Sequence, residues 1–150
     1  MAPIQKKSIE LAESYLKRAL NKQMESRDHL AGYRFAESVS ASQECIELSI
    51  KAVFLLLDLE SPKEHKFTEE QFRELIRRVP AKLTHRDFAK VYLYSMFWST
   101  FYTVAKYGLE KVQAGPDKLF EKEEAELALK HAQRCRDAAA DLANYVRHPW

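Results

Sequence analysis

The sequence contains few of the residues that form tight turns. It has only three glycines among 150 residues, whereas Ala, Leu, Glu and Lys are abundant. A fold made of many short strands needs turn-forming residues at regular intervals, so this composition argues against a β-rich protein. Almost half of the residues are hydrophobic, which is enough for one core, and the length favours a single domain over residues 1–150. We therefore expect one all-α domain.

Cysteine, long apolar runs and excess charge are also scarce. The two cysteines, Cys45 and Cys135, fall on apolar faces of predicted helices, where a free thiol behaves as a small hydrophobic side chain. The longest uncharged run, Val91 to Ala105, is shorter than the roughly 20 residues that a membrane-spanning helix needs. The net charge of +2 implies no particular nucleic-acid or membrane partner by itself. We expect a cytoplasmic protein that does not contact a membrane.

Motifs for metals and cofactors are absent from the sequence. It has no glycine-rich phosphate loop, no His-Glu-x-x-His and no cysteine pairs at zinc spacing. His131 and Cys135 stand four residues apart on one predicted helix, but two ligands do not make a metal site, and Cys135 belongs to an apolar seam. We expect neither a metal nor a cofactor.

Hydrophobic periodicity predicts an antiparallel up-and-down bundle of about five helices, four long and one short. The first should span Ile4–Lys22 and end at the polar segment Glu25–Asp28. The second should span Phe35–Leu59 and be apolar on two faces, so it needs neighbours on two sides. Pro62 is expected to end it.

Three more helices follow. Thr68 and Gln71 form a capping box at the start of the short third helix, with Phe67 placed as its hydrophobic staple. Thr84 is expected to cap a fourth helix that runs to about Tyr107. The last helix, from about Phe120 to Tyr145, carries a narrow seam of small residues that predicts close packing against a neighbour. The seam consists of Ala125, Ala128, Ala132, Cys135, Ala139, Leu142 and Val146.

The fourth predicted helix is apolar around almost its whole circumference. A helix of this kind is central to a bundle or covered by another subunit, and a chain of this size needs both. We therefore expect a homodimer whose interface includes Tyr94, Phe97, Trp98 and Phe101.

The strongest local charge feature lies between the third and fourth helices. Asp87 is the only acidic residue among five cations there, which are Arg77, Arg78, Lys82, Arg86 and Lys90. Such a patch can bind phosphate through its charge and through free backbone N–H groups at a helix start. The alternative is a solvated rim, because cations are favourable at the end of any helix.

Three blocks, in their order and spacing, resemble the HEPN family, the higher eukaryotes and prokaryotes nucleotide-binding domain. The first is the ASQECIELSIKA segment at residues 41–52, and the second is Pro62–His65 followed by a short helix. The third joins Ala105–Gly108 to Leu119–Phe120 and the Ala-rich last helix. The resemblance implies a helical bundle that dimerises. It also implies one of two roles: metal-independent RNA cleavage by an Arg–His motif, or nucleotide binding beside a small nucleotidyltransferase partner in a toxin-antitoxin system.

The Arg–His motif is not found where the resemblance would place it. Lys106 stands at the expected arginine, and residues 111–113 contain no histidine. Lysine keeps the charge but lacks the forked grip of arginine on phosphate. Arg78 and His85 have the required spacing, but Pro80 lies between them and they precede the aromatic helix.

The sequence therefore predicts a homodimeric, non-catalytic HEPN module that binds nucleotide or RNA phosphates and acts with a nucleotidyltransferase. Lys106 and Tyr107 are added to the phosphate-binding residues because they lie in the family-like block. The alternative is a HEPN ribonuclease toxin using Arg78 and His85, and a third possibility is a structural dimer without a ligand.

Overall fold

The computed structural model describes residues 6–60 and 67–149 of the chain. Within these ranges it contains seven α-helices, two short 3₁₀ helices and no strand beyond one isolated bridge between Leu109 and Ala114. The all-α prediction is confirmed. The elements are α1 (Lys6–Ala31), α2 (Phe35–Leu56), α3 (Glu69–Arg78), η1 (Ala81–Leu83), α4 (Phe88–Ser99), α5 (Tyr102–Tyr107), η2 (Glu110–Val112), α6 (Pro116–Leu119) and α7 (Lys122–Arg147).

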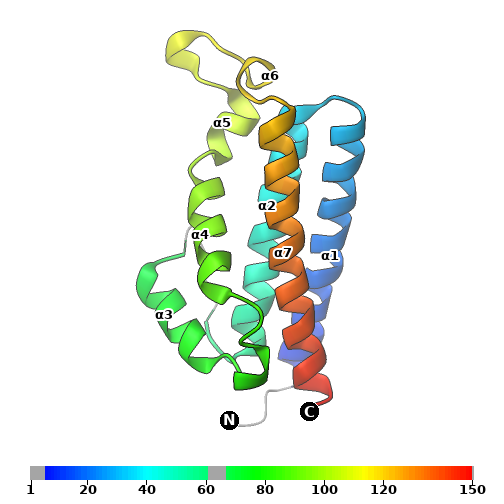
Figure 1. Cartoon of the computed structure of the whole chain (residues 1–150), viewed down its shortest axis with the longest axis vertical. Coiled ribbons are helices and arrows are strands. Elements are labelled where there is room, and N and C mark those ends of the chain that lie inside the picture. Colours follow the sequence, from blue (N-terminus) through cyan, green and yellow to red (C-terminus); the bar gives the residue numbers. More distant parts are fainter. Residues whose placement is uncertain (1–5, 61–66, 150) are drawn as a thin grey trace.

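The helices form an up-and-down bundle, as the sequence predicts (Figure 1). Helix α1 runs up, α2 runs down, α4 and α5 together form a third upward column, and α7 returns downward. Helix α3 lies outside the lower part of α4, and the segment from η2 to α6 projects at the opposite end. No helix in the described ranges is both long enough and apolar enough to cross a membrane.

Helix α1 does not end at Glu25–Asp28, so that prediction is wrong. The helix continues to Ala31 because Ser26 finds polar partners on α2. The Ser26 hydroxyl lies 2.9 Å from the Ser38 hydroxyl and 2.7 Å from that of Ser42, and all three residues are buried. Hydrogen bonds to protein partners offset the cost of burying a hydroxyl, so a polar residue is tolerated inside the helix pair.

Helix α2 ends earlier than Pro62 would require. Asp58 adopts a left-handed conformation, with φ of 57°, and the Leu59 N–H donates to the Phe54 carbonyl at 2.8 Å. This is a Schellman arrangement, which closes a helix without a proline. The predicted end at Leu59 is therefore late, and Pro62 itself lies outside the described residues, as do Ile4 and the Pro62–His65 block.

Helix α3 begins as predicted. The Thr68 hydroxyl accepts from the Gln71 N–H at 3.2 Å, and the Gln71 side chain accepts from the Thr68 N–H at 2.7 Å. Phe67 is buried 5.8 Å from Phe72, ring centre to ring centre, which is the staple contact. Both predictions for this cap, the box and the staple, are confirmed.

The aromatic helix starts and ends differently from the prediction. Its cap is Asp87, whose carboxylate accepts from the Lys90 N–H at 3.2 Å, whereas Thr84 ends η1. The helix also breaks at residues 100–101 into α4 and α5. The Gln43 side chain on α2 donates to the Trp98 carbonyl, and the Thr100 hydroxyl donates back to the Met96 carbonyl at 3.0 Å. Side chains that occupy backbone carbonyls in this way interrupt a helix.

The small-residue seam of α7 packs against α2, as predicted. Its residues from Ala125 to Leu142 are almost fully buried, and the Cys45 thiol of α2 lies 3.8 Å from the Ala132 carbonyl. Burial raises the pKa of Cys45 to about 12 and that of Cys135 well above its usual value. Both thiols are therefore inert core groups, and the close seam positions α7 against the bundle.

Candidate functional site

A hollow of about 200 Å³ lies between the first turns of α4 and the middle of α7. The chain that enters α4 provides one wall, and α7 provides the other. Its lining consists of His85, Arg86, Asp87, Lys90, Val91, Tyr94, Arg134 and Ala138. Three cationic side chains, Arg86, Lys90 and Arg134, thus line a single open space.

The charges around this hollow are only partly neutralised. The Arg86 guanidinium bonds to the Asp141 carboxylate at 2.5 Å, and His85 Nε2 lies 3.7 Å from the same carboxylate. Among the described residues, neither Lys90 nor Arg134 has a carboxylate within ion-pair distance. Because two cations remain unpaired beside one another, the hollow favours an anion.

Tyr94 forms the floor of the hollow. The residue is only 7% exposed, and its hydroxyl oxygen accepts from the Arg134 guanidinium at 2.9 Å. A phenol also has one hydrogen to donate. No acceptor for that hydrogen lies on the described part of the chain. The floor therefore offers a buried donor to a ligand.

His131 supports Tyr94 from behind. The two rings stack with their centres 3.8 Å apart and their planes 11° apart, and the Trp98 indole donates to His131 Nδ1 at 3.0 Å. Burial, and then the neighbouring charges of Arg134 and Lys130, lowers the pKa of His131 to about 4. At neutral pH the ring is therefore uncharged and acts as a fixed support for Tyr94.

The predicted phosphate-binding residues do not all gather in one place. Arg86 and Lys90 line the hollow, whereas Arg77 and Arg78 lie at the end of α3 and Lys82 is exposed on η1. Lys106 and Tyr107 lie on α5, at the other end of the bundle (Figure 1). There the Lys106 amine donates to the Tyr102 hydroxyl at 3.0 Å and lies 3.9 Å from Glu44.

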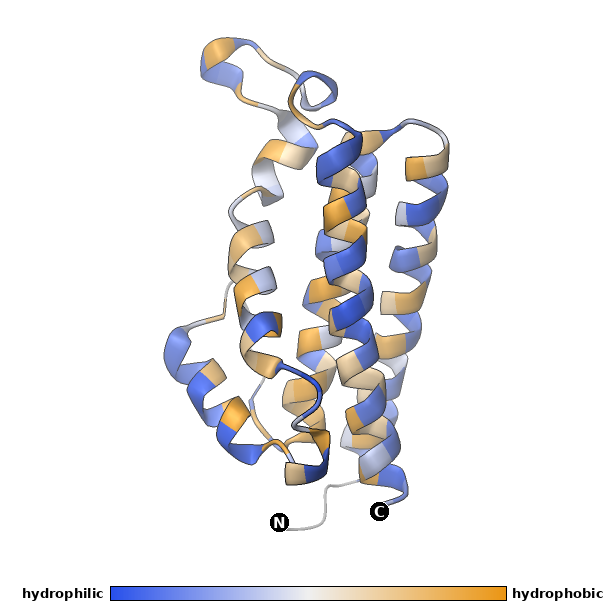
Figure 2. Cartoon of the chain, viewed as in Figure 1, coloured by the Kyte–Doolittle hydropathy of each residue, from blue (hydrophilic) through white to orange (hydrophobic). Residues whose placement is uncertain are grey.

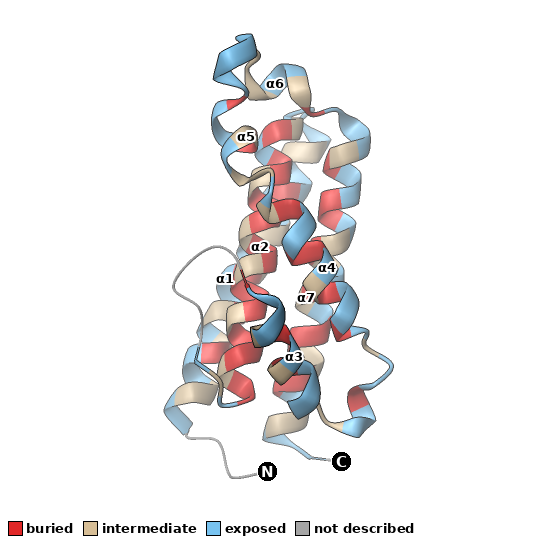
Figure 3. Cartoon of the chain, turned by 90° about the vertical axis from the view of Figure 1, so that its left-hand side faces the viewer, coloured by how far each residue is buried: buried red, intermediate tan, exposed pale blue. Residues whose placement is uncertain are grey.

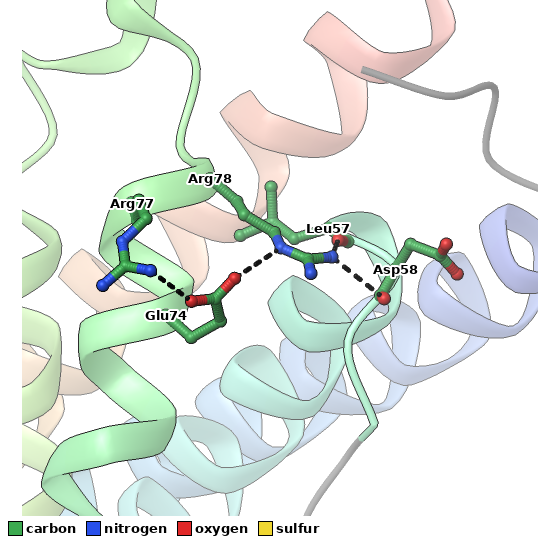
Figure 4. A network of polar contacts seen from close by, with 5 residues as sticks. All are labelled: Leu57, Asp58, Glu74, Arg77 and Arg78. Carbon is green, nitrogen blue, oxygen red and sulfur yellow. Dashed lines mark hydrogen bonds and ion pairs between the residues drawn. The ribbon is translucent and has the colours of Figure 1, made fainter.

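Arg78 has a structural role at the end of α2 (Figure 4). Its guanidinium donates to the Leu57 carbonyl at 3.2 Å, to the Asp58 carbonyl at 3.3 Å and to Glu74 at 3.0 Å. Arg77 bonds only to Glu74 in this network, at 3.1 Å. Arg78 thus caps the carbonyl end of α2, while His85, the other half of the Arg–His candidate, faces Asp141.

The four predicted interface residues divide into two pairs. Trp98 and Tyr94 are buried inside the single chain, at 2% and 7% exposure. Phe97 is 45% exposed, and its ring packs edge-on against Phe101, which is half-buried. Only the second pair has enough exposed surface to contact a second subunit in this structure.

Sequence reasoning missed Arg134 as a member of the basic site. Its local sequence is an ordinary polar helix face, and it lies far along the chain from Lys90. Only the antiparallel return of α7 beside α4 brings the two cations together (Figure 1). No local spacing signals such a pair.

Comparison with known protein families shows to which family the chain belongs. A family model described as the HEPN domain matches residues 12–142, which is most of the sequence. The chain belongs to the HEPN family. The resemblance drawn from the three sequence blocks is thereby confirmed.

A solved structure supports the same fold. This HEPN chain superposes on the crystal structure of TT1696 from Thermus thermophilus with a TM-score of 0.64 and 17% sequence identity. The match covers 87% of this chain and 97% of that one, so the two share a fold along nearly their whole length. A search of curated proteins finds no match.

Proposed function

We propose that this HEPN protein is a non-catalytic binding module that holds phosphate groups of a nucleotide or RNA in the hollow between α4 and α7. The observation that carries the proposal is the convergence of Arg86, Lys90 and Arg134 on one hollow with a buried Tyr94 hydroxyl at its floor. Arginine and lysine side chains with a hydroxyl donor are the groups that bind phosphate oxygens.

Several features favour binding over cleavage. Metal-independent RNA cleavage needs a base for the 2′-hydroxyl and a cation for the phosphate, held side by side. Arg78 is engaged by the end of α2, and Lys106 bonds to Tyr102 far from any histidine of the hollow. His131 is engaged by Trp98 and Tyr94. The hollow is thus equipped to hold an anion.

Salt-dependent binding tests the proposal. Affinity for a short single-stranded RNA and for nucleotides should be measured against salt for the wild type and the Arg86→Ala/Arg134→Ala variant. Each lost phosphate contact lowers the slope of log K against log salt by about 0.7 for a single strand. We expect the variant to bind at least tenfold more weakly, with a slope lower by about 1.4.

The matched control removes two arginines elsewhere. The Arg73→Ala/Arg77→Ala variant loses the same charge from the exposed face of α3, where each guanidinium pairs with a glutamate. Its affinity, and its slope of log K against log salt, should match those of the wild type apart from the small change that its lower net charge causes. An equal loss in both variants, or no binding by the wild type, would contradict the proposal.

The alternative function is a metal-independent ribonuclease, and one observation favours it. His85 lies beside both Asp141 and Arg86 at the rim of the hollow. A carboxylate can orient a histidine as a general base, and an arginine can hold the phosphate. Incubation of RNA with wild type and with His85→Ala, without metal, separates the two functions. Cleavage that disappears in His85→Ala would establish the alternative.

We also propose that the protein is a homodimer in which the outer face of α4 is covered by a second copy. Leu93, Met96 and Phe97 follow one another on that face and are 54%, 49% and 45% exposed. Figure 2 shows α4 hydrophobic over successive turns, whereas α1 and α7 carry hydrophilic outer faces. A stable interface buries about 800 Å² per partner, so this stripe needs polar neighbours around it.

Light scattering tests the dimer. The wild type should be dimeric at micromolar concentration, and Leu93→Glu/Phe97→Glu should be a folded monomer, because two charges in an apolar contact have no partners. A monomeric wild type, or a variant that stays dimeric, would refute this interface. The nucleotidyltransferase partner, in a toxin-antitoxin-like pair, rests on the family alone, and co-purification with a neighbouring gene product of that class is its test.

A further inference from the structure

A small cavity lies beside the break between α4 and α5. It measures about 20 Å³, and α2, the second half of α4 and the start of α5 all contribute to its lining. The lining includes three polar residues, Gln43, Ser95 and Ser99, and three apolar ones, Ile46, Phe67 and Trp98. Polar groups thus meet in a space that is otherwise walled by the core.

Two buried polar groups at this cavity need hydrogen-bond partners. Gln43 is only 6% exposed, and its Nε2 amide donates to the Trp98 carbonyl. Its Oε1 oxygen has no donor on the described part of the chain. Ser95 is 7% exposed, and its hydroxyl has no hydrogen bond to any of the described residues. Buried polar groups without partners are costly, so a partner from outside the chain would stabilise this region.

Ser99 adds a third polar group at the same cavity. Its hydroxyl donates to the Met96 carbonyl at 3.0 Å and can still accept a hydrogen bond. One molecule that donates to Gln43 and Ser99 and accepts from Ser95 would therefore match all three groups. Water can donate twice and accept, and a buried water molecule typically makes about three hydrogen bonds.

The size and charge of the cavity favour water over other small ligands. A cavity needs roughly 10–15 Å³ to accept one water molecule, so a cavity of about 20 Å³ holds one. A sodium ion is of similar size, but the carboxylate in the lining, Glu47, lies 3.0 Å from the Lys51 amine. Because the charge of Glu47 is balanced in this way, the cavity favours a neutral molecule over a cation.

The cavity lies where the third column of the bundle is interrupted without the usual local cause. Residues 88–107 contain neither glycine nor proline, which often interrupt helices. The backbone departs from helical geometry at Phe101, with φ of −99° and ψ of 6°, and Figure 1 shows α4 and α5 as separate coils. A side chain or a water molecule inserted among the helix carbonyls also interrupts a helix. Gln43 of α2 supplies the side chain, because it bonds to the Trp98 carbonyl.

We infer that this cavity is a binding site for one internal water molecule, which donates to Gln43 Oε1 and Ser99 Oγ and accepts from Ser95 Oγ. The water and the Gln43 amide together link α2 to the third column and keep α4 and α5 as two helices. The site shares no residue with the hollow between α4 and α7, so it does not depend on the proposed function.

Oxygen-17 magnetic relaxation dispersion tests the site, because it counts the water molecules that stay in a protein for longer than the protein takes to tumble. Ser95→Val removes the hydroxyl and fills the cavity with methyl groups, and we expect it to lower the count by one. The control, Ser14→Val, makes the same change at an exposed position of α1 and should leave the count unchanged. An unchanged count in Ser95→Val, or a wild type without a long-lived water, would overturn the inference.

A second variant keeps the space for the water. Ser95→Ala removes only one of its three hydrogen bonds, so the fold should be retained and the residence time of the water should shorten several-fold. Circular dichroism checks the fold of both Ser95 variants. A residence time equal to that of the wild type would overturn the assignment of Ser95 as a partner.

A change of salt separates water from a bound cation. The water count and the thermal midpoint of the wild type should be the same in sodium chloride and in choline chloride of equal concentration. A higher midpoint that requires sodium would show that the cavity binds the ion, and the assignment to water would be wrong.

Gln43→Met tests the link between the site and the helix break. Methionine fills a similar volume but has no amide, so the Trp98 carbonyl is released and the water loses one partner. We expect the carbon-13 chemical shifts of Phe101 to move to helical values and the water count to fall by one. Gln133→Met makes the same change on α7, outside the cavity, and should alter neither. Wild-type shifts for Phe101 in Gln43→Met would overturn the role of Gln43 in the break.

Discussion

The two halves of this bundle are built from different residues and leave different surfaces. In the α1–α2–α7 half, alanine and serine allow the helices to approach closely, and residues such as Ala12, Ala19 and Ala132 have no exposed surface. In the α3–α4–α5 half, buried aromatic residues alternate along the chain with exposed hydrophobic residues. Phe97 and Leu93 remain about half exposed, and the basic hollow opens where α4 of this half meets α7.

The difference shows how a small helical protein separates stability from binding. Small residues at a helix interface allow the two helices to pack closely along it, without internal gaps. Large side chains hold helices apart, so gaps open where polar residues interrupt the aromatic face. Figure 3 shows this contrast as continuous burial along α2, against the mostly exposed surface of α3. We therefore expect substitutions to act mainly on folding in one half and on ligands or partners in the other.

Removal of the same side chain from each half should give the largest contrast. Leu142→Ala on α7 creates a cavity at a residue with no exposed surface, and we expect it to reduce the free energy of unfolding by about 3 kcal/mol. Leu93→Ala on α4 removes a half-exposed side chain and should change it by less than about 0.5 kcal/mol in the monomer. Urea denaturation monitored by circular dichroism measures both. Similar losses would mean that the halves do not differ as described.

Arg78 joins the two halves, because it extends from α3 to the carbonyl end of α2. Arg78→Ala leaves the Leu57 and Asp58 carbonyls without this donor and should cost about 1 kcal/mol of stability, allowing for its partial exposure. Arg77→Ala removes only an exposed ion pair and should cost no more than a few tenths. RNA affinity should change equally little in both variants. A specific loss of RNA affinity in Arg78→Ala would show that Arg78 contacts a ligand.

The pH dependence of stability should reveal the neutral His131 at the contact between α4 and α7. Its folded pKa of about 4 lies below the usual value of 6.5, so the unfolded chain takes up the proton first as pH falls. Stability is thus unaffected by this group above pH 6.5, decreases between pH 6.5 and 4, and levels off below. After allowance for partial exposure, the decrease is on the order of 1 kcal/mol. His131→Gln should flatten the profile in that window, and a parallel profile would exclude the assignment.

The polar stripe of α2 should give the smallest effect. Lys51 lies 3.0 Å from Glu47, one turn earlier on the same helix, and Lys51→Gln should cost a few tenths of a kcal/mol in low salt. The corresponding change Lys122→Gln affects a more exposed pair at the start of α7 and should be smaller still. Thermal melts at low and high salt measure both, and the difference between them should shrink as salt is added.

Sequence patterns predicted the fold class and the local signals well. The capping box at Thr68, the staple at Phe67 and the small-residue seam of α7 depend on neighbours within one or two turns, so their spacing is visible in the sequence. The helix ends were predicted less well. Ser26 does not break α1 because its partners are on α2, and the aromatic helix breaks where Gln43 reaches it from α2. These partners are distant in sequence.

The candidate site was predicted only in part, for the same reason. Arg86 and Lys90 are close in sequence to the other cations of the loop, so the charge run identified them. Nothing in the sequence around Arg134 indicates that it lines the hollow. Arg78 belongs to the same run of cations as Arg86 and Lys90, but it bonds to the end of α2. Charge density in the sequence therefore located the region but did not distinguish a ligand-binding arginine from a capping arginine.

Three properties could be predicted from the amino-acid sequence: the all-α class, a resemblance to the HEPN family, and a last helix whose small residues pack closely against a neighbour. The fold class and the seam follow from composition and from periodicities of three and four residues, which act within single helices. The resemblance rests instead on the order and spacing of three sequence blocks. The tertiary structure was needed to show which cations share a hollow and which aromatic residues are already buried. Those properties arise where antiparallel helices bring distant residues into contact, and no pattern within one helix specifies them.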